Sequence, residues 1–186
     1  MEPIAFVEPF VAALLRRYVH PGETMLDVGC GPAGYRAVAG GRYVGVDISD
    51  AIYAPAGRRG LDAAAAADRL PFRDASFDLV MSKSAFFMMP DPRATLGEFR
   101  RVLKQGGRVL LVDYNARTQR KLGRAEGKAW PCWSQWQLRD LVAGCGFRDC
   151  TILPALAREM GTLEALLRPL LQEYFGTWAV VTGVKG

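Results

Sequence analysis

Apolar segments of strand length alternate along this chain with segments whose apolar residues recur at helical spacing. Between positions 92 and 103 the apolar residues recur every three or four positions, and a Lys-Gln-Gly-Gly turn follows at 104–107. This pattern predicts a helix that ends in a turn before a strand. Five segments have the character of strands: 24–28, 43–46, 61–66, 77–81 and 108–112. Such alternation is typical of a parallel sheet covered by helices.

The last third of the chain extends this pattern. Ser134 has the character of an N-cap for a helix that runs to Ala143, and segments 147–153 and 177–184 are two further predicted strands, which complete a sheet of seven. Segment 61–66 is ambiguous, because its alanines favour a helix while its position before a turn favours a short strand. We predict the strand.

Three stretches fall outside the predicted sheet layers: the first 20 residues, 114–133 and 155–174. The stretch 155–174 carries a stripe of leucines on one helical face. Such a stripe is more typical of core packing or of a dimer surface than of a lid over a ligand. The sequence therefore leaves a monomer and a homodimer open.

Composition narrows the classes of protein. With 186 residues, half of them hydrophobic and 23% charged, residues 1–186 are expected to form one globular domain. No apolar run reaches the roughly 20 residues that cross a bilayer, and no signal peptide is evident, so we expect a cytoplasmic protein that does not bind membranes. The four cysteines form no C-x-x-C pair, and His20 is the only histidine. Neither a metal site nor a Ser-His-Asp triad is therefore expected.

The net charge of +5 is unevenly distributed. Five cations crowd the stretch after Asn115, against one acidic residue, Glu126; they are Arg117, Arg120, Lys121, Arg124 and Lys128. Such a patch attracts nucleic acid or an acidic substrate. We favour the plainer interpretation of a solvated loop or helix face, because charged residues mostly face water.

A glycine-rich loop follows the first predicted strand. Segment 29–34 satisfies G-x-G-x-x-G, the pattern of a dinucleotide site, in which backbone N–H groups bind a pyrophosphate. Here Asp27 precedes the first glycine and Pro32 removes one N–H, and both changes weaken a phosphate site. A cationic ligand without phosphate, such as S-adenosylmethionine, suits the loop better.

Carboxylates also follow the next two predicted strands. Asp47 ends the second strand, where it can accept hydrogen bonds from both ribose hydroxyls, and Asp68 follows the third, where it can accept one from an adenine amino group. In a parallel sheet Asp27, Asp47 and Asp68 share the carboxyl edge. Any one of these carboxylates can be a helix or turn cap, but three of them at the ends of three successive strands predict a ligand site.

Five ordered motifs resemble those of small-molecule class I S-adenosylmethionine-dependent methyltransferases, the type 11 methyltransferase domain. They are Leu26-Asp27-Val28-Gly29-Cys30-Gly31, Gly45-Val46-Asp47-Ile48-Ser49, Asp68-Arg69-Leu70-Pro71-Phe72, Ser76-Phe77-Asp78-Leu79-Val80 and Arg101-Val102-Leu103-Lys104-Gln105-Gly106-Gly107. The resemblance implies an α/β, three-layer Rossmann-like sandwich whose seven-stranded sheet is mostly parallel, with the last strand antiparallel.

The resemblance also implies contacts with S-adenosylmethionine for ten residues: Asp27, Gly29, Gly31, Asp47, Ile48, Ala67, Asp68, Arg69, Ser82 and Lys83. Two positions depart from the family pattern. Phe86-Phe87-Met88-Met89 stands where members often have Leu-His-His-Leu, and Gln105 replaces a usual proline. The first departure removes polar groups and suggests an apolar wall near the methyl group, although core packing explains Phe86 and Met89 equally well.

Methyl transfer needs alignment and exclusion of water more than acid–base groups. The sequence assigns no catalytic residue, and the candidates for taking a proton are weak: His20, Tyr35, Lys83, Asp113 and Tyr114. The fourth strand lacks the Asn/Asp-Pro-Pro-Tyr/Phe signature of relatives that methylate planar amino groups, which argues against such substrates.

Three functional hypotheses follow. The favoured one is methylation of a small, partly apolar metabolite; the second is methylation of RNA or another anionic macromolecule, suggested by the basic stretch. The third is a scaffold protein that binds S-adenosylmethionine without catalysis, suggested by the missing polar residues.

Overall fold

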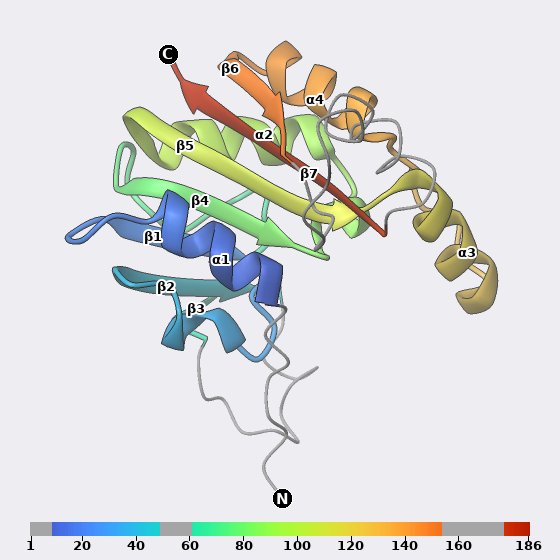
Figure 1. Cartoon of the computed structure of the whole chain (residues 1–186), viewed down its shortest axis with the longest axis horizontal. Helices are drawn as coiled ribbons and strands as arrows, with labels where there is room; N and C mark the ends of the chain where they lie inside the picture. Colours follow the sequence, from blue (N-terminus) through green and yellow to red (C-terminus); the bar gives the residue numbers. More distant parts are fainter. Residues whose placement is uncertain (1–8, 49–60, 154–176) are drawn as a thin grey trace, which may run out of the picture.

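The computed structural model describes residues 9–48, 61–153 and 177–186, which contain a seven-stranded sheet of order β3-β2-β1-β4-β5-β7-β6 (Figure 1). The neighbours from β3 to β5 pair in parallel, and β7 runs antiparallel to both β5 and β6. The strands are β1 (Thr24–Val28), β2 (Arg42–Asp47), β3 (Ala63–Ala64), β4 (Phe77–Lys83), β5 (Leu103–Tyr114), β6 (Phe147–Ile152) and β7 (Trp178–Lys185). The predicted sheet is confirmed, including its antiparallel last strand.

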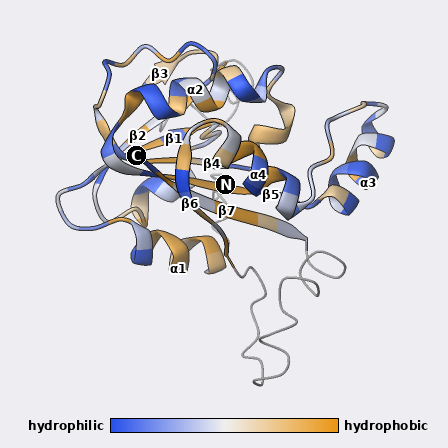
Figure 2. Cartoon of the chain, turned by 90° about the horizontal axis from the view of Figure 1, so that it is seen from above, coloured by the Kyte–Doolittle hydropathy of each residue, from blue (hydrophilic) through white to orange (hydrophobic). Residues whose placement is uncertain are grey.

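Helices cover both faces of the sheet. The helical elements described are α1 (Pro9–Tyr18), η1 (Gly34–Ala37), η3 (Phe86–Met88), α2 (Pro92–Val102), α3 (Ala116–Glu126) and α4 (Gln135–Gly144). In Figure 2 the sheet is seen between α1 on one side and α2 on the other. One core cluster joins α2 and α4 to the sheet through Phe99 and Leu138, and a second joins α1 through Val11 and Leu15. These layers are the expected three-layer α/β sandwich.

Several local predictions are confirmed. Strand β1 has the predicted bounds, and α4 begins after Ser134, whose hydroxyl accepts a hydrogen bond from Gln137 N while the Gln137 side chain accepts one from Ser134 N. The reciprocal pair is a capping box, which satisfies two N–H groups at the helix start.

Other elements differ from expectation. The predicted strand 61–66 contracts to Ala63–Ala64, because only these residues pair with Val46 and Asp47 of β2. The basic stretch contains the helix α3, which Asn115 caps through a hydrogen bond from Thr118 N. The leucine stripe of 155–174 lies outside the described residues. None of the helices in the described ranges is long and apolar enough to span a membrane.

The strand order places a switch point beside β1. From β1 the chain proceeds to β2 and β3 on one side, and then crosses over to β4 and β5 on the other. In open α/β sheets, ligands bind where the strand order reverses, at the carboxyl ends of the strands. The fold therefore predicts a site between the carboxyl ends of β1 and β4.

Candidate active site

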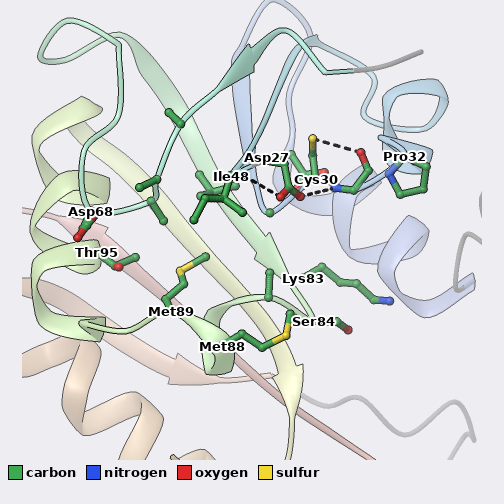
Figure 3. Close-up of a pocket in the computed structure, with 18 of the residues that line it drawn as sticks. Asp27, Cys30, Pro32, Ile48, Asp68, Lys83, Ser84, Met88, Met89 and Thr95 are labelled. Atoms are coloured by element: carbon green, nitrogen blue, oxygen red, sulfur yellow. Dashed lines mark hydrogen bonds between the residues drawn. The ribbon is translucent and has the colours of Figure 1, made fainter. Parts of the chain in front are cut away.

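A cavity of about 540 Å³ lies at the carboxyl ends of β1, β2 and β4. Figure 3 shows it with Asp27 and Ile48 on one side and Met88 and Met89 on the other. Two walls differ in chemistry. The polar wall consists of Asp27, Asp47 and the glycine loop 29–31, and the methionine wall consists of Met88 and Met89.

The glycine loop is fixed to the neighbouring strand. The amides of Gly29 and Cys30 both donate to Val46 O, at 2.8 and 3.1 Å. Gly29 has φ +76°, and a Cβ atom added there would lie 2.3 Å from the Cβ of Ala85. Gly29 is thus required by the close approach of the segment that follows β4, in addition to any approach by a ligand.

The segment after the loop differs from that of a dinucleotide site. It forms only the four-residue 3₁₀ helix η1, whose N-cap residue Ala33 has no side-chain hydrogen bond. A pyrophosphate site uses the free amides and aligned dipole of a longer helix. Because η1 is so short, the loop is better suited to a ligand that carries no phosphate.

Asp27 is the most buried carboxylate of the polar wall, at 1% exposure. The hydroxyl of Tyr43 donates to its Oδ2 at 2.6 Å. Burial raises the pKa of Asp27 to about 7; the Tyr43 hydrogen bond lowers it, the negative charge of Asp47 adds to the rise, and Lys83 opposes it. A cation in the cavity would favour the charged carboxylate and draw the pKa down again.

Asp47 connects β2 to the glycine loop. Its Oδ2 accepts from Gly31 N at 3.0 Å and its Oδ1 from Ile48 N at 2.7 Å. A carboxylate has about four acceptor positions, so Asp47 retains acceptor capacity at the cavity, where a pair of ribose hydroxyls can donate. Beside it the side chain of Ile48 is 66% exposed and gives the polar wall one apolar surface.

Asp68 lies on a loop that α2 holds in place. Arg101 donates to Leu70 O at 3.0 Å and to Phe72 O at 2.8 Å, while Glu98 accepts from Leu70 N at 2.8 Å. The Arg101 hydrogen bond, more than any other effect, holds the pKa of Glu98 below its usual value. This clamp cannot be predicted from the sequence, because nothing in the local pattern links residues about thirty positions apart.

The methionine wall belongs to the segment after β4. Phe86 and Phe87 are buried, whereas Met88 is 50% exposed and lines the cavity with Met89. From behind, the fully buried Asp113 accepts a hydrogen bond from Phe87 N at 2.8 Å. Burial raises the pKa of Asp113 to about 7. The wall is thus apolar toward the cavity and hydrogen-bonded on its far side.

Eight of the ten residues expected to contact the cofactor line this cavity: Asp27, Gly29, Gly31, Asp47, Ile48, Ala67, Asp68 and Lys83. Arg69 and Ser82 are outside the lining. Arg69 is an exposed neighbour of Asp68, and Ser82 is buried within β4, at 1% exposure.

The candidates for taking a proton separate into two groups. Lys83 and Tyr35 line the cavity, and the Lys83 ammonium lies 5.0 Å from the centre of the Trp178 ring. Tyr114, whose ring stacks on Trp178, is outside the lining. His20 is exposed and precedes β1, so it lies at the amino end of that strand, away from the cavity. The structure thus removes the geometric reason for considering His20 as a base.

Among the residues the structure describes, no group of three or more His, Cys, Asp or Glu side chains is arranged to hold a metal ion.

Part of the chain is similar to a known protein family. Residues 26–111 match the model of a methyltransferase domain family. The 2-methyl-6-phytyl-1,4-hydroquinone methyltransferase of Synechocystis sp. is 35% identical over 116 residues, which are 55% of this chain and 35% of that protein. The chain spans less than half the length of the curated relatives first matched, from 30% to 41%.

Solved structures share the fold. The YcgJ protein of Bacillus subtilis superposes with a TM-score of 0.68 at 19% identity, over 96% of this chain and 99% of that one. Phosphoethanolamine N-methyltransferase 2 of Haemonchus contortus, solved with S-adenosyl-L-methionine, has a TM-score of 0.67 at 20% identity. The superposition covers 93% of this chain and 51% of that one. Residues 26–111 are thus similar to a methyltransferase domain family, and these solved structures show that the chain shares their fold.

Proposed function

We propose that this protein transfers the methyl group of S-adenosylmethionine to a small, partly apolar acceptor. One observation carries the proposal: the two walls of the same cavity differ in chemistry. The polar wall has carboxylates, and the methionine wall has the apolar side chains of Met88 and Met89. The relative from Synechocystis, named for a phytyl-substituted hydroquinone, supports an acceptor of this kind.

The polar wall fits the cofactor. The buried carboxylate of Asp27 complements an ammonium or sulfonium group, and Asp47 retains acceptor capacity for a diol. Asp68, at the far end of the cavity in Figure 3, can accept a hydrogen bond from an adenine amino group. Held by Asp27, Asp47 and Asp68, S-adenosylmethionine would supply a methyl carbon on a positively charged sulfur to the lone pair of an acceptor, and S-adenosylhomocysteine would leave with the electron pair of the carbon–sulfur bond.

The chain's own contribution is alignment and exclusion of water. Met88 and Met89 present an apolar surface that packs against an acceptor and displaces water from it. Of the residues that the sequence offered as candidates for taking a proton, Lys83 and Tyr35 line the cavity and can hold or accept a proton at the acceptor. Methyl transfer needs no further acid–base group when the acceptor is already deprotonated.

The test is turnover by the full chain. We expect S-adenosylmethionine to bind in calorimetry, and S-adenosylhomocysteine to form with an apolar acceptor from a panel of phenols, carboxylic acids and amines. Asp47→Ala should abolish both, whereas Asp140→Ala, which removes the same charge from an exposed side chain of α4, should change neither.

Unchanged binding by the Asp47→Ala variant would contradict the assigned cofactor site. Binding without turnover on every acceptor would instead favour a scaffold protein that retains the cofactor pocket.

A further inference from the structure

The helix α3 carries a strongly basic surface that the proposed methyl transfer leaves unused. Its exposed cations, together called the basic face, are Arg117, Arg120, Lys121 and Arg124. Lys128 follows the helix, and the one acidic residue of this stretch, Glu126, pairs with it at 3.1 Å. Most of the chain's net charge of +5 is therefore concentrated on and just after α3.

The cations share one side of the helix. At 100° per residue, positions 117, 120, 121 and 124 fall within an arc of about 100°. The residues buried against the body, Ala116, Gln119 and Gly123, lie on a different arc. With a rise of 1.5 Å per residue, the basic face extends over about 10 Å, which is the length of a short run of phosphates.

Three of the four cations of the basic face have no ion-pairing role in the described part of the chain. Arg120, Lys121 and Arg124 form no ion pair with any residue in the described ranges, and all three are exposed. In both Figure 1 and Figure 2, α3 projects away from the sheet and its covering helices. A projecting helix with Arg120, Lys121 and Arg124 on one side has an electrostatic cost that an anionic partner would relieve.

An aromatic connection joins α3 to the cavity. Trp130, which follows the helix, makes a T-shaped contact with Phe87, with ring centroids 4.9 Å apart. The ammonium of Lys128 lies over the Trp130 ring, 5.3 Å from its centre. Gln119 fixes this connection by donating to Tyr114 O at 2.6 Å and accepting from Trp133 N at 2.9 Å. The basic face is thus tied to the segment that carries the methionine wall.

We propose that the basic face of α3 and the half-buried Trp130 bind single-stranded RNA. Sites for single-stranded nucleic acid combine cations that follow the phosphates with aromatic rings that stack on bases, and this region supplies both. Arginine, which dominates the basic face, contacts phosphate through two N–H groups at once.

Other partners fit less well. An amphipathic helix that binds membranes needs a broad apolar face, but Leu122 is the only large aliphatic side chain of α3. An acidic protein would match the charge but would offer no planar base to the half-buried ring of Trp130. The proposal concerns binding alone and is independent of the acceptor proposed above, so each can fail without the other.

The test is fluorescence anisotropy of the full chain with a labelled oligouridylate of about 20 nucleotides. Four phosphate contacts predict a slope of about −2.8 for log K against log salt, so affinity should fall about 50-fold between about 50 and 200 mM salt. In the triple variant Arg120→Gln, Lys121→Gln, Arg124→Gln, the slope should fall to about −0.7. Glutamine has a helix propensity close to that of arginine, so α3 should remain folded.

A matched control removes the same charge elsewhere. The triple variant Arg42→Gln, Arg73→Gln, Arg148→Gln changes three exposed cations outside α3 and should bind the RNA nearly as the parent does. Equal losses in both triple variants would reduce the effect to general charge attraction and overturn the proposal. Absence of binding at low salt would also overturn it.

Two further measurements separate RNA from other anions. Trp130→Leu should weaken binding of the oligouridylate more than binding of a polyphosphate chain, because only the RNA has bases to stack. Poly-L-glutamate should compete poorly. Competition by poly-L-glutamate at equal charge concentration would overturn the RNA assignment in favour of an acidic protein partner.

Discussion

The two walls of the cavity are built by different means. The polar wall is held by hydrogen bonds between neighbouring strand ends, such as those from Gly29 N to Val46 O and from Gly31 N to Asp47. The methionine wall presents no such bonds to the cavity and is held from behind through Asp113. The polar wall therefore has little freedom to vary, whereas Met88 can change without breaking a hydrogen bond. This difference suggests that the donor site is fixed by the fold, and the acceptor preference by packing.

The largest expected effect comes from a larger side chain where the glycine loop approaches the segment after β4. Gly29→Ala places a Cβ atom 2.3 Å from that of Ala85 and forces alanine to φ +76°. Overpacking and the left-handed backbone together should lower the free energy of unfolding by about 2–4 kcal/mol and abolish cofactor binding. Urea denaturation and calorimetry measure the two effects.

The control for Gly29→Ala is Gly40→Ala. Gly40 has a similar φ of +66°, but nothing lies within 4 Å of an added Cβ atom. Gly40→Ala should therefore lower the free energy of unfolding only by the cost of the left-handed backbone, about 1 kcal/mol. An equal loss in both variants would mean that the contact with Ala85 is unimportant.

Two buried carboxylates should make stability depend on pH: Asp27 in the polar wall and Asp113 behind the methionine wall. Asp27 and Asp113 both have a pKa raised to about 7, so the native state keeps their protons where the unfolded chain, with a pKa near 3.8, has released them. The free energy of unfolding should therefore fall as the pH rises from about 4 to 7, by about 1.4 kcal/mol per unit for each group, and then level off. Urea titrations at several pH values in this range measure the free energy of unfolding. Asp113→Asn should make its dependence on pH less steep.

Cofactor affinity should separate the two carboxylates. Charged Asp27 attracts a cationic ligand, so affinity for S-adenosylmethionine should increase as the pH rises through 7, while stability falls. Asp27→Asn should remove this dependence, and Asp113→Asn, whose side chain is outside the cavity lining, should leave it unchanged. If both variants lost it, the polar wall would not be what recognises the donor.

The sequence predicted more of the polar wall than of the methionine wall. Asp27, Asp47 and Asp68 follow three successive strands, and a strand end is a position that local hydrophobic pattern predicts well. The contacts that were missed are tertiary: Asp113 to Phe87 N, and Arg101 to the loop at 70–74. They join residues 26 to 31 positions apart, which no local periodicity reveals. For the same reason the sequence favoured a strand of six residues where β3 has two.

A smaller effect is expected from the clamp that holds the loop of Asp68, which lines the same cavity. Arg101→Gln removes the hydrogen bonds to Leu70 O and Phe72 O, and the 31% exposure of Arg101 limits their net contribution, so stability should fall by about 1 kcal/mol. Affinity for S-adenosylmethionine should fall severalfold, with little change in kcat, because the loop is positioned less well. Arg100→Gln, which loses one hydrogen bond to Gly146 O at the other side of the helix, should leave affinity unchanged.

The smallest effect on stability is expected from substitution of Met88, which also tests most directly whether the two walls have different roles. Because this side chain is half exposed and makes no hydrogen bond to the residues that the structure describes, Met88→Ala should change stability by less than about 0.5 kcal/mol and leave the affinity for S-adenosylmethionine unchanged. The KM for an apolar acceptor should rise, since the variant removes apolar contact area, and Met88→Leu should restore most of it. A change in cofactor affinity without a change in acceptor KM would place Met88 with the polar wall, and the division of the cavity into a donor side and an acceptor side would be wrong.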